Sequence, residues 1–154
     1  MAKKATTMDA QLILHLYELR REAELRKARN WWMGEFWPQT ADDFLKVSSA
    51  MGSQENNWLR QVPSYWSMAA SFALNGVLNT DMFLQPAVSG EMYFVFAKIH
   101  PFLKELREKM GDPHLFGNLE KVINSTKFGR ERLKSTLNRV QMLTEKRAAA
   151  AKTN

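Results

Sequence analysis

The sequence predicts an all-α protein, a compact bundle of about five or six helices with a central buried helix at residues 53–78. Apolar residues recur at spacings of three and four almost throughout the chain, and no run of four or more residues alternates as a β-strand would. The seven Gly and five Pro fall mostly between the periodic segments. With nine Phe, nine Met and five Trp, the 154 residues can form one well-packed domain.

The domain organisation follows from where this periodicity begins and ends. We expect a basic N-terminal tail at residues 1–7, a single helical domain at residues 8–147, and a tail at residues 148–154 that is disordered or ordered by a partner.

The first helix is expected to begin at Thr6 or Thr7 and to stop before Pro38. It runs into the aromatic cluster at residues 31–37. Because successive helical residues turn by about 100°, Trp31 and Trp32 cannot share one face. Either the helix ends inside this cluster or a second element covers it. The expected buried stripe of this helix is Leu12, Leu16, Leu19 and Ala23.

Thr40, followed by acidic residues, predicts the start of a short second helix that ends at Gly52. Ser53 then opens the central helix, whose apolar stripe nearly encircles it, and Pro63 should kink or divide that helix. The apolar residues of this helix include Trp58, Leu59, Val62, Tyr65, Trp66, Ala69, Phe72, Ala73 and Val77.

The C-terminal half of the chain contains the remaining helices. A short piece runs from Asn79 to Pro86, and a longer helix runs from Ser89 to Gly111 with a kink at Pro101. Asp112-Pro113 then predicts a helix start. We expect a break at Phe128-Gly129, with Arg130 beginning the last helix, because an unbroken helix would point Phe128 about 150° away from the apolar stripe.

Three segments carry a resemblance to a known family. They are SYWSMAASFALNGVL at residues 64–78, LYELRR at residues 16–21 and FAKIHPF at residues 96–102. Together they resemble a family of small bacterial proteins of unknown function, over about residues 8–145. The resemblance implies a mostly helical bacterial protein, and it brings no catalytic residues to carry over.

Catalytic and metal-binding patterns are absent from the sequence. The chain has no Cys, and His15, His100 and His114 are not at metal-ligand spacings, although they could meet in space. No GxSxG, Walker A or GxGxxG motif occurs. We therefore expect a protein that is not an enzyme, with no cofactor and no small-molecule substrate. Without a secretory signal or a membrane-length apolar run, we expect it in the cytoplasm.

Basic residues concentrate at the two ends of the chain. Residues 1–30 carry seven Lys/Arg and four Asp/Glu, residues 120–154 carry nine and three, and residues 31–119 have a net charge of −3. On the last helix the cations fall on two flanks of the apolar stripe, which is a plausible footprint for phosphates or a solvated charge bias. The candidate anion- or partner-binding residues are Lys121, Lys127, Arg130, Arg132, Lys134 and Arg139.

The aromatic cluster allows three interpretations: a core corner, a membrane-interface contact, or a platform for stacking bases. The candidate aromatic contact residues are Trp31, Trp32, Phe36, Trp37 and Phe128.

Taken together, these patterns favour a non-catalytic binding or assembly protein, a subunit or accessory factor of a larger bacterial complex that docks through helix faces and basic ends. Its partner would be another protein or a second copy. One alternative is an RNA- or ribosome-binding protein that uses the basic C-terminal helix. The other is a peripheral membrane protein attached through the first helix and the Trp cluster.

Overall fold

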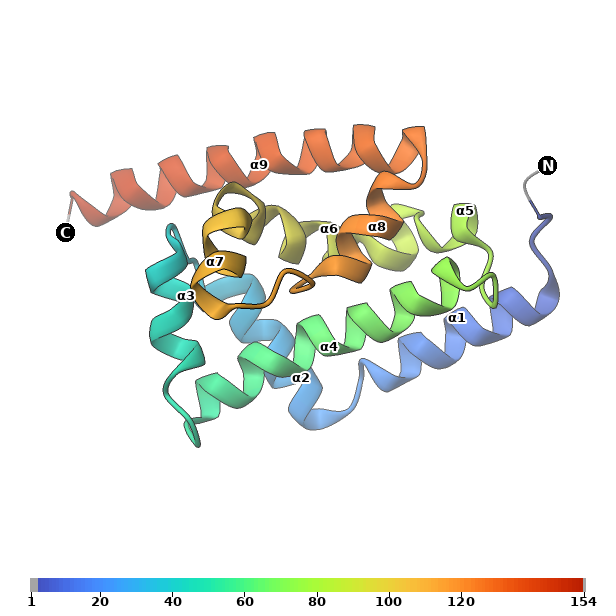
Figure 1. Ribbon diagram of the computed structural model, residues 1–154, viewed down its shortest axis with the longest axis horizontal. Coiled ribbons are helices and arrows are strands. Elements are labelled where there is room, and N and C mark those ends of the chain that lie inside the picture. The colour runs from blue at the N-terminus through green and yellow to red at the C-terminus, as the bar shows by residue number, and fades with distance from the viewer. Residues whose placement is uncertain (1–2, 154) are drawn as a thin grey trace.

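The computed structural model describes residues 3–153, and every regular element in this range is helical, which confirms the predicted fold class (Figure 1). There are more helices than predicted because breaks divide several of the expected segments. The elements are α1 (Thr7–Leu19), α2 (Ala23–Asn30), the π-helical turn η1 (Trp31–Glu35), α3 (Ala41–Ser48), α4 (Gln54–Leu74), α5 (Thr80–Phe83), α6 (Pro86–Ile99), the 3-10 turn η2 (His100–Phe102), α7 (Leu103–Met110), α8 (Gly117–Asn124) and α9 (Lys127–Ala151).

The helices stack in three layers. Figure 1 shows α9 along one side, α6 and α8 in the middle, and α4 with α1 and α2 on the other side. The predicted central helix is α4, which contacts α2, α3, α5, α6 and α8 but buries only one face. The most completely enclosed segment is in α6, where seven of the eight residues from Met92 to Ile99 are buried.

The predicted first helix is divided in two. The first part, α1, stops at Leu19, and α2 begins at Ala23. Glu22 caps α2, because its carboxylate accepts a hydrogen bond of 2.9 Å from the Leu25 amide. At the break Arg20 is buried, with its guanidinium 4.8 Å from the Tyr17 ring centroid and 5.2 Å from that of Trp66. Such a long-range contact cannot be seen in local periodicity.

The proline-based predictions had different outcomes. Of the two effects expected at Pro63, division of the helix does not occur, because α4 continues through this residue. Asp112-Pro113 does not start a helix, because α8 begins only at Gly117. Arg107 holds the intervening turn by donating from Nε to the Leu115 carbonyl at 3.0 Å. The predicted kink at Pro101 is confirmed, since η2 separates α6 from α7 there.

The start of the last helix also differs from the prediction. Thr126 is its N-cap, so the break lies just before Phe128 rather than at Phe128-Gly129, and Phe128 is 43% exposed. At Gly129 a Cβ atom would lie 2.0 Å from the Ile123 carbonyl oxygen at the end of α8. Glycine therefore allows α9 to turn back closely against α8.

The two ends of the described chain differ from free tails. Near the N-terminus, the Lys3 carbonyl accepts a hydrogen bond from the Asn79 side chain, and the Lys3 ammonium donates to the Gly76 carbonyl at 3.3 Å. At the other end, α9 extends to Ala151 and includes part of the predicted tail. Residues 1–2 and 154, which belong to the two predicted tails, lie outside the described residues. Within residues 3–153, no helix combines the length and the apolar character needed to cross a membrane.

The close approach at Gly129 gives a first prediction. Gly129→Ala should lower the free energy of unfolding by about 1–3 kcal/mol, because the added methyl group would force α8 and α9 apart. Chemical denaturation followed by circular dichroism measures the change. Gly117→Ala is the matched control, since no atom outside its own chain neighbours lies within 4 Å of its added Cβ. Equal stabilities of the two variants would contradict the prediction.

Candidate functional site

The predicted basic residues lie mainly on the two flanks of α9, as the helical spacing indicates. Leu133, Thr136 and Val140 face the body of the protein. At about 100° per residue, one flank carries Lys127, Arg130 and Lys134, and the opposite flank carries Arg132 and Arg139. Lys121 is separate from both, because it lies on α8.

The first flank is partly occupied by local contacts. The Arg130 guanidinium donates to the Asn124 carbonyl at 2.6 Å, and the Lys127 ammonium lies 3.7 Å from the Glu131 carboxylate. Lys134 is exposed and has no carboxylate within 4 Å among the described residues.

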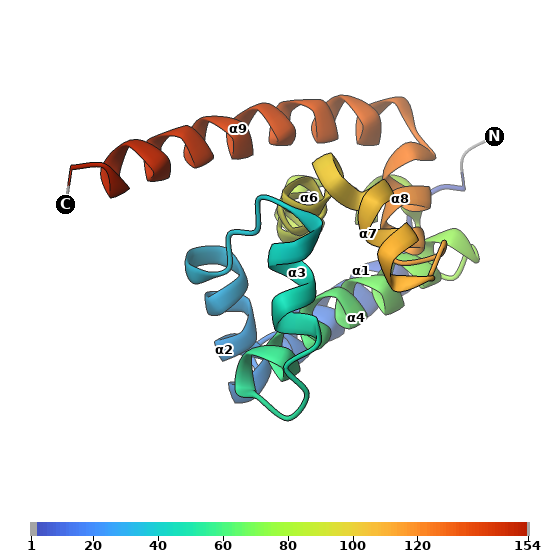
Figure 2. The same cartoon turned by 60° about the vertical axis from the view of Figure 1, so that its left-hand side comes forward.

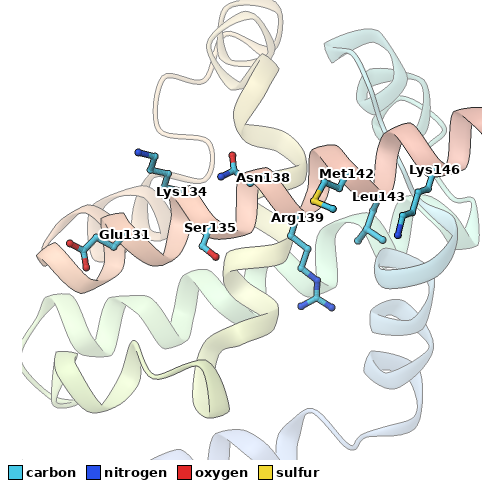
Figure 3. A pocket seen from close by; sticks show the side chains of 8 residues that line it. All are labelled: Glu131, Lys134, Ser135, Asn138, Arg139, Met142, Leu143 and Lys146. Atoms are coloured by element: carbon cyan, nitrogen blue, oxygen red, sulfur yellow. The ribbon is translucent and has the colours of Figure 1, made fainter.

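The opposite flank forms a continuous line along the helix, here called the basic stripe. Its members recur every three or four residues: Phe128, Arg132, Ser135, Arg139, Leu143 and Lys146. Within residues 3–153, none of its three cations lies within 4 Å of a carboxylate oxygen. Figure 3 shows Ser135, Arg139, Leu143 and Lys146 projecting from the same side of α9. The stripe therefore carries uncompensated positive charge.

A polar pocket of about 440 Å³ lies beside the basic stripe, between η1, α6 and α9. Among the described residues, Glu91 contributes the only carboxylate in its lining, and each of its oxygens accepts a hydrogen bond. One accepts from Arg29 Nε at 2.7 Å and the other from Trp66 Nε1 at 3.0 Å. The pocket is lined by Met33, Gly90, Glu91, Phe94, Arg132, Ser135, Thr136 and Arg139.

Most of the candidate aromatic residues belong to the core. Trp31, Trp32 and Phe36 are buried, and the Trp31 and Phe36 rings stack with centroids 4.5 Å apart. The core-corner interpretation is therefore correct for these three residues, and they are not available to bases or lipids in this conformation. Of the candidate residues, Trp37 is half-buried and Phe128 is exposed.

Lys98 is a buried cation that the sequence interpretation missed. It is 3% exposed, and its ammonium donates to the carbonyl oxygens of Trp32, at 2.5 Å, and Phe36. These carbonyls lie in and just after η1, so Lys98 acts as a cap from another helix. The signal in the sequence was a single cation in the otherwise apolar run from Met92 to Ile99.

Two cations lie against the ring of Trp37. Lys98 Nζ is 4.2 Å from the ring centroid and Arg147 Cζ is 4.8 Å from it. The indole Nε1 donates to Thr144 Oγ1 at 2.8 Å. Trp37 therefore joins α6 to the C-terminal half of α9.

The three histidines do not form a metal site with one another. His15, His100 and His114 are all exposed, and His100 packs edge-on against Phe96 with a centroid distance of 5.6 Å. Among residues 3–153, no three His, Cys, Asp or Glu side chains gather in a way that could hold a metal ion.

The fold and these surfaces define a helical domain with a long basic C-terminal helix. Residues 5–126 match the family described as a domain of unknown function, DUF4760, and the chain belongs to this family. The matched region ends at Thr126, the N-cap of α9. No curated protein and no solved structure matches the chain.

The buried ammonium predicts an unusual pH dependence of stability. Burial lowers the pKa of Lys98 to about 7, and the charge of Arg147 acts in the same direction. Between this value and the ordinary pKa of lysine, the unfolded chain binds one more proton than the folded chain. The free energy of unfolding should therefore rise with pH, by up to about 1.4 kcal/mol per pH unit.

Denaturation between pH 7.5 and 9.5 measures this slope. The pH slope should disappear in Lys98→Met. It should remain in the control variant Lys104→Met, which alters an exposed lysine. Parallel pH profiles for wild type and Lys98→Met would refute the assignment.

Proposed function

We propose that this protein is a non-catalytic assembly protein, an accessory subunit of a larger complex in a bacterial cytoplasm, and that it binds an acidic partner protein along α9. The observation that carries the proposal is the exposed face around Met142. Its side chain is 59% exposed and lies about one turn from Arg139 and from Lys146 (Figure 3). Met142 is an apolar contact point between two cations, Arg139 and Lys146, that lack carboxylate neighbours in the described chain. This combination favours a partner surface that is both acidic and amphipathic.

The shape of α9 supports docking on this face. Its C-terminal turns extend beyond the rest of the molecule (Figures 1 and 2). The residues from Glu145 to Ala151 are exposed, and four of them are consecutive alanines starting at Ala148. Small side chains allow a partner helix to approach closely. Met142 and Leu143 lie on the same open face of α9 as Arg139 and Lys146.

Charge favours a different protein over a second copy of this chain. In a symmetric dimer through this face, Arg139 and Lys146 of one copy would meet the same cations of the other. Like charges placed together disfavour such a contact. The acidic partner that we propose avoids this repulsion.

The proposal predicts that Met142→Glu combined with Lys146→Glu weakens partner binding while the fold is retained. Native affinity purification with quantitative mass spectrometry identifies partners enriched with the wild-type protein. The purified partner is then titrated against each variant. Binding should weaken at least tenfold because the anchor and one cation both become acidic.

The matched control is Lys4→Glu combined with Lys104→Glu, which makes two charge reversals at exposed sites outside α9. The control should bind like the wild type. A clean monomer with no enriched partner, or equal loss of binding in both double variants, would count against the proposal.

RNA binding is the second candidate function, and the exposed Phe128 favours it. This ring is 43% exposed and lies one turn before Arg132 on the basic stripe. An exposed ring beside unpaired arginines could stack on a base while the cations contact phosphates. The membrane alternative lacks comparable support, because Trp31 and Trp32 are buried.

The RNA candidate predicts single-stranded RNA binding that weakens steeply with salt. It should be lost when Arg130→Ala, Arg132→Ala and Lys134→Ala are combined. Fluorescence anisotropy at several salt concentrations measures both effects. Salt-insensitive binding, or no binding at low salt, would exclude this candidate.

A further inference from the structure

We infer that the polar pocket between η1, α6 and α9 is a binding site for a small phosphate monoester. This site adjoins the docking face around Met142 and shares Ser135 and Arg139 with it. Arg132 and Arg139 line it from α9, and Ser135 lies between them on the same side of the helix.

The first argument is the state of Arg132. Its Nε atom is buried and has no hydrogen-bond partner among the described residues. An unpaired buried donor is costly, because this N–H has lost water without gaining an acceptor. The Arg132 side chain is itself partly exposed and lines the pocket, so a small adjustment on binding could turn this donor toward an oxyanion, and guanidinium groups suit phosphate through paired N–H donors.

The second argument is the charge of the pocket. Glu91 pairs with Arg29, and among the described residues its carboxylate lies within 4 Å of neither Arg132 nor Arg139. The Arg29–Glu91 pair is neutral as a unit, so Arg132 and Arg139 leave two uncompensated positive charges. A phosphate monoester carries close to two negative charges at neutral pH. A phosphodiester carries only one, so the charge favours the monoester.

The third argument is size and lining. The volume of about 440 Å³ is typical of a small-molecule site. Met33 and Phe94 provide apolar surface for the organic part of a ligand, and the Ser135 hydroxyl can donate to a phosphate oxygen. Thr136 is less suited to this role, because its hydroxyl donates to the Arg132 carbonyl at 2.8 Å.

Titration with glycerol 3-phosphate, followed by NMR of the arginine Nε–H signals and by calorimetry, tests the inference. The Arg132 Nε–H signal should shift on saturation. Arg132→Gln and Arg139→Gln should each weaken binding at least tenfold. The matched controls are Arg130→Gln and Lys134→Gln, which remove the same charge from the opposite flank of α9 and should bind normally.

Two further probes identify the source of the phosphate group. Inorganic phosphate should bind more weakly than glycerol 3-phosphate, because it cannot use the apolar wall. A single-stranded oligonucleotide without terminal phosphates should not compete with glycerol 3-phosphate. Competition by the oligonucleotide, equal weakening by the control variants, or no binding of glycerol 3-phosphate at millimolar concentration would each overturn the inference.

Arg139 is exposed, so Arg139→Gln keeps the test decisive if Arg132→Gln does not fold. The inference and the proposed assembly function can be tested apart, although the two surfaces share Arg139. Met142→Glu combined with Lys146→Glu alters no residue that lines the pocket and should retain glycerol 3-phosphate binding. Loss of glycerol 3-phosphate binding in that variant would overturn the assignment of the ligand to this pocket.

Discussion

The contact between the Lys98 ammonium and the carbonyl oxygens of Trp32 and Phe36 connects the central layer of the fold to the aromatic cluster. A buried cation with no acidic partner is costly, and it is tolerated here because two carbonyls and an aromatic ring surround it. In return, carbonyls that the π-helical turn leaves unpaired gain a donor. These Lys98 contacts place η1 against α6 and set Trp37 against α9.

Glu91 makes a second polar connection from α6, to Arg29 on α2 and Trp66 on α4. The two charged residues thus tie one buried helix of the C-terminal half to several elements of the N-terminal half. Apolar packing brings these helices together, whereas directional bonds from Glu91 and Lys98 select one relative placement.

Local signals were sufficient where local contacts decide the structure. The three- and four-residue spacing predicted helices throughout, and Thr40 and Ser53 do cap the helices that they were expected to start. Predictions failed where a distant side chain decides. Arg20 packs on Trp66 where the first helix breaks, and Arg107 holds the turn that Asp112-Pro113 was expected to make helical.

The same limit applies to the candidate site. Helical spacing was enough to assign Arg132 and Arg139 to one flank of α9, but the pocket also needs Met33 and Glu91, which come from distant elements. Periodicity within one helix cannot reveal which loop or helix faces it. The sequence likewise showed that Phe128 lies off the apolar stripe. It did not show where α9 begins, because that position depends on the Thr126 cap.

The placement of Trp37 gives the protein a built-in optical reporter. Its indole touches α9 through Thr144 and Arg147, while Trp31, Trp32 and Trp66 lie in the core. Indole emission responds to nearby charges and to water. Any event that lifts the C-terminal half of α9 would remove one cation from the ring and admit solvent, so the movement of this helix can be followed without an attached dye.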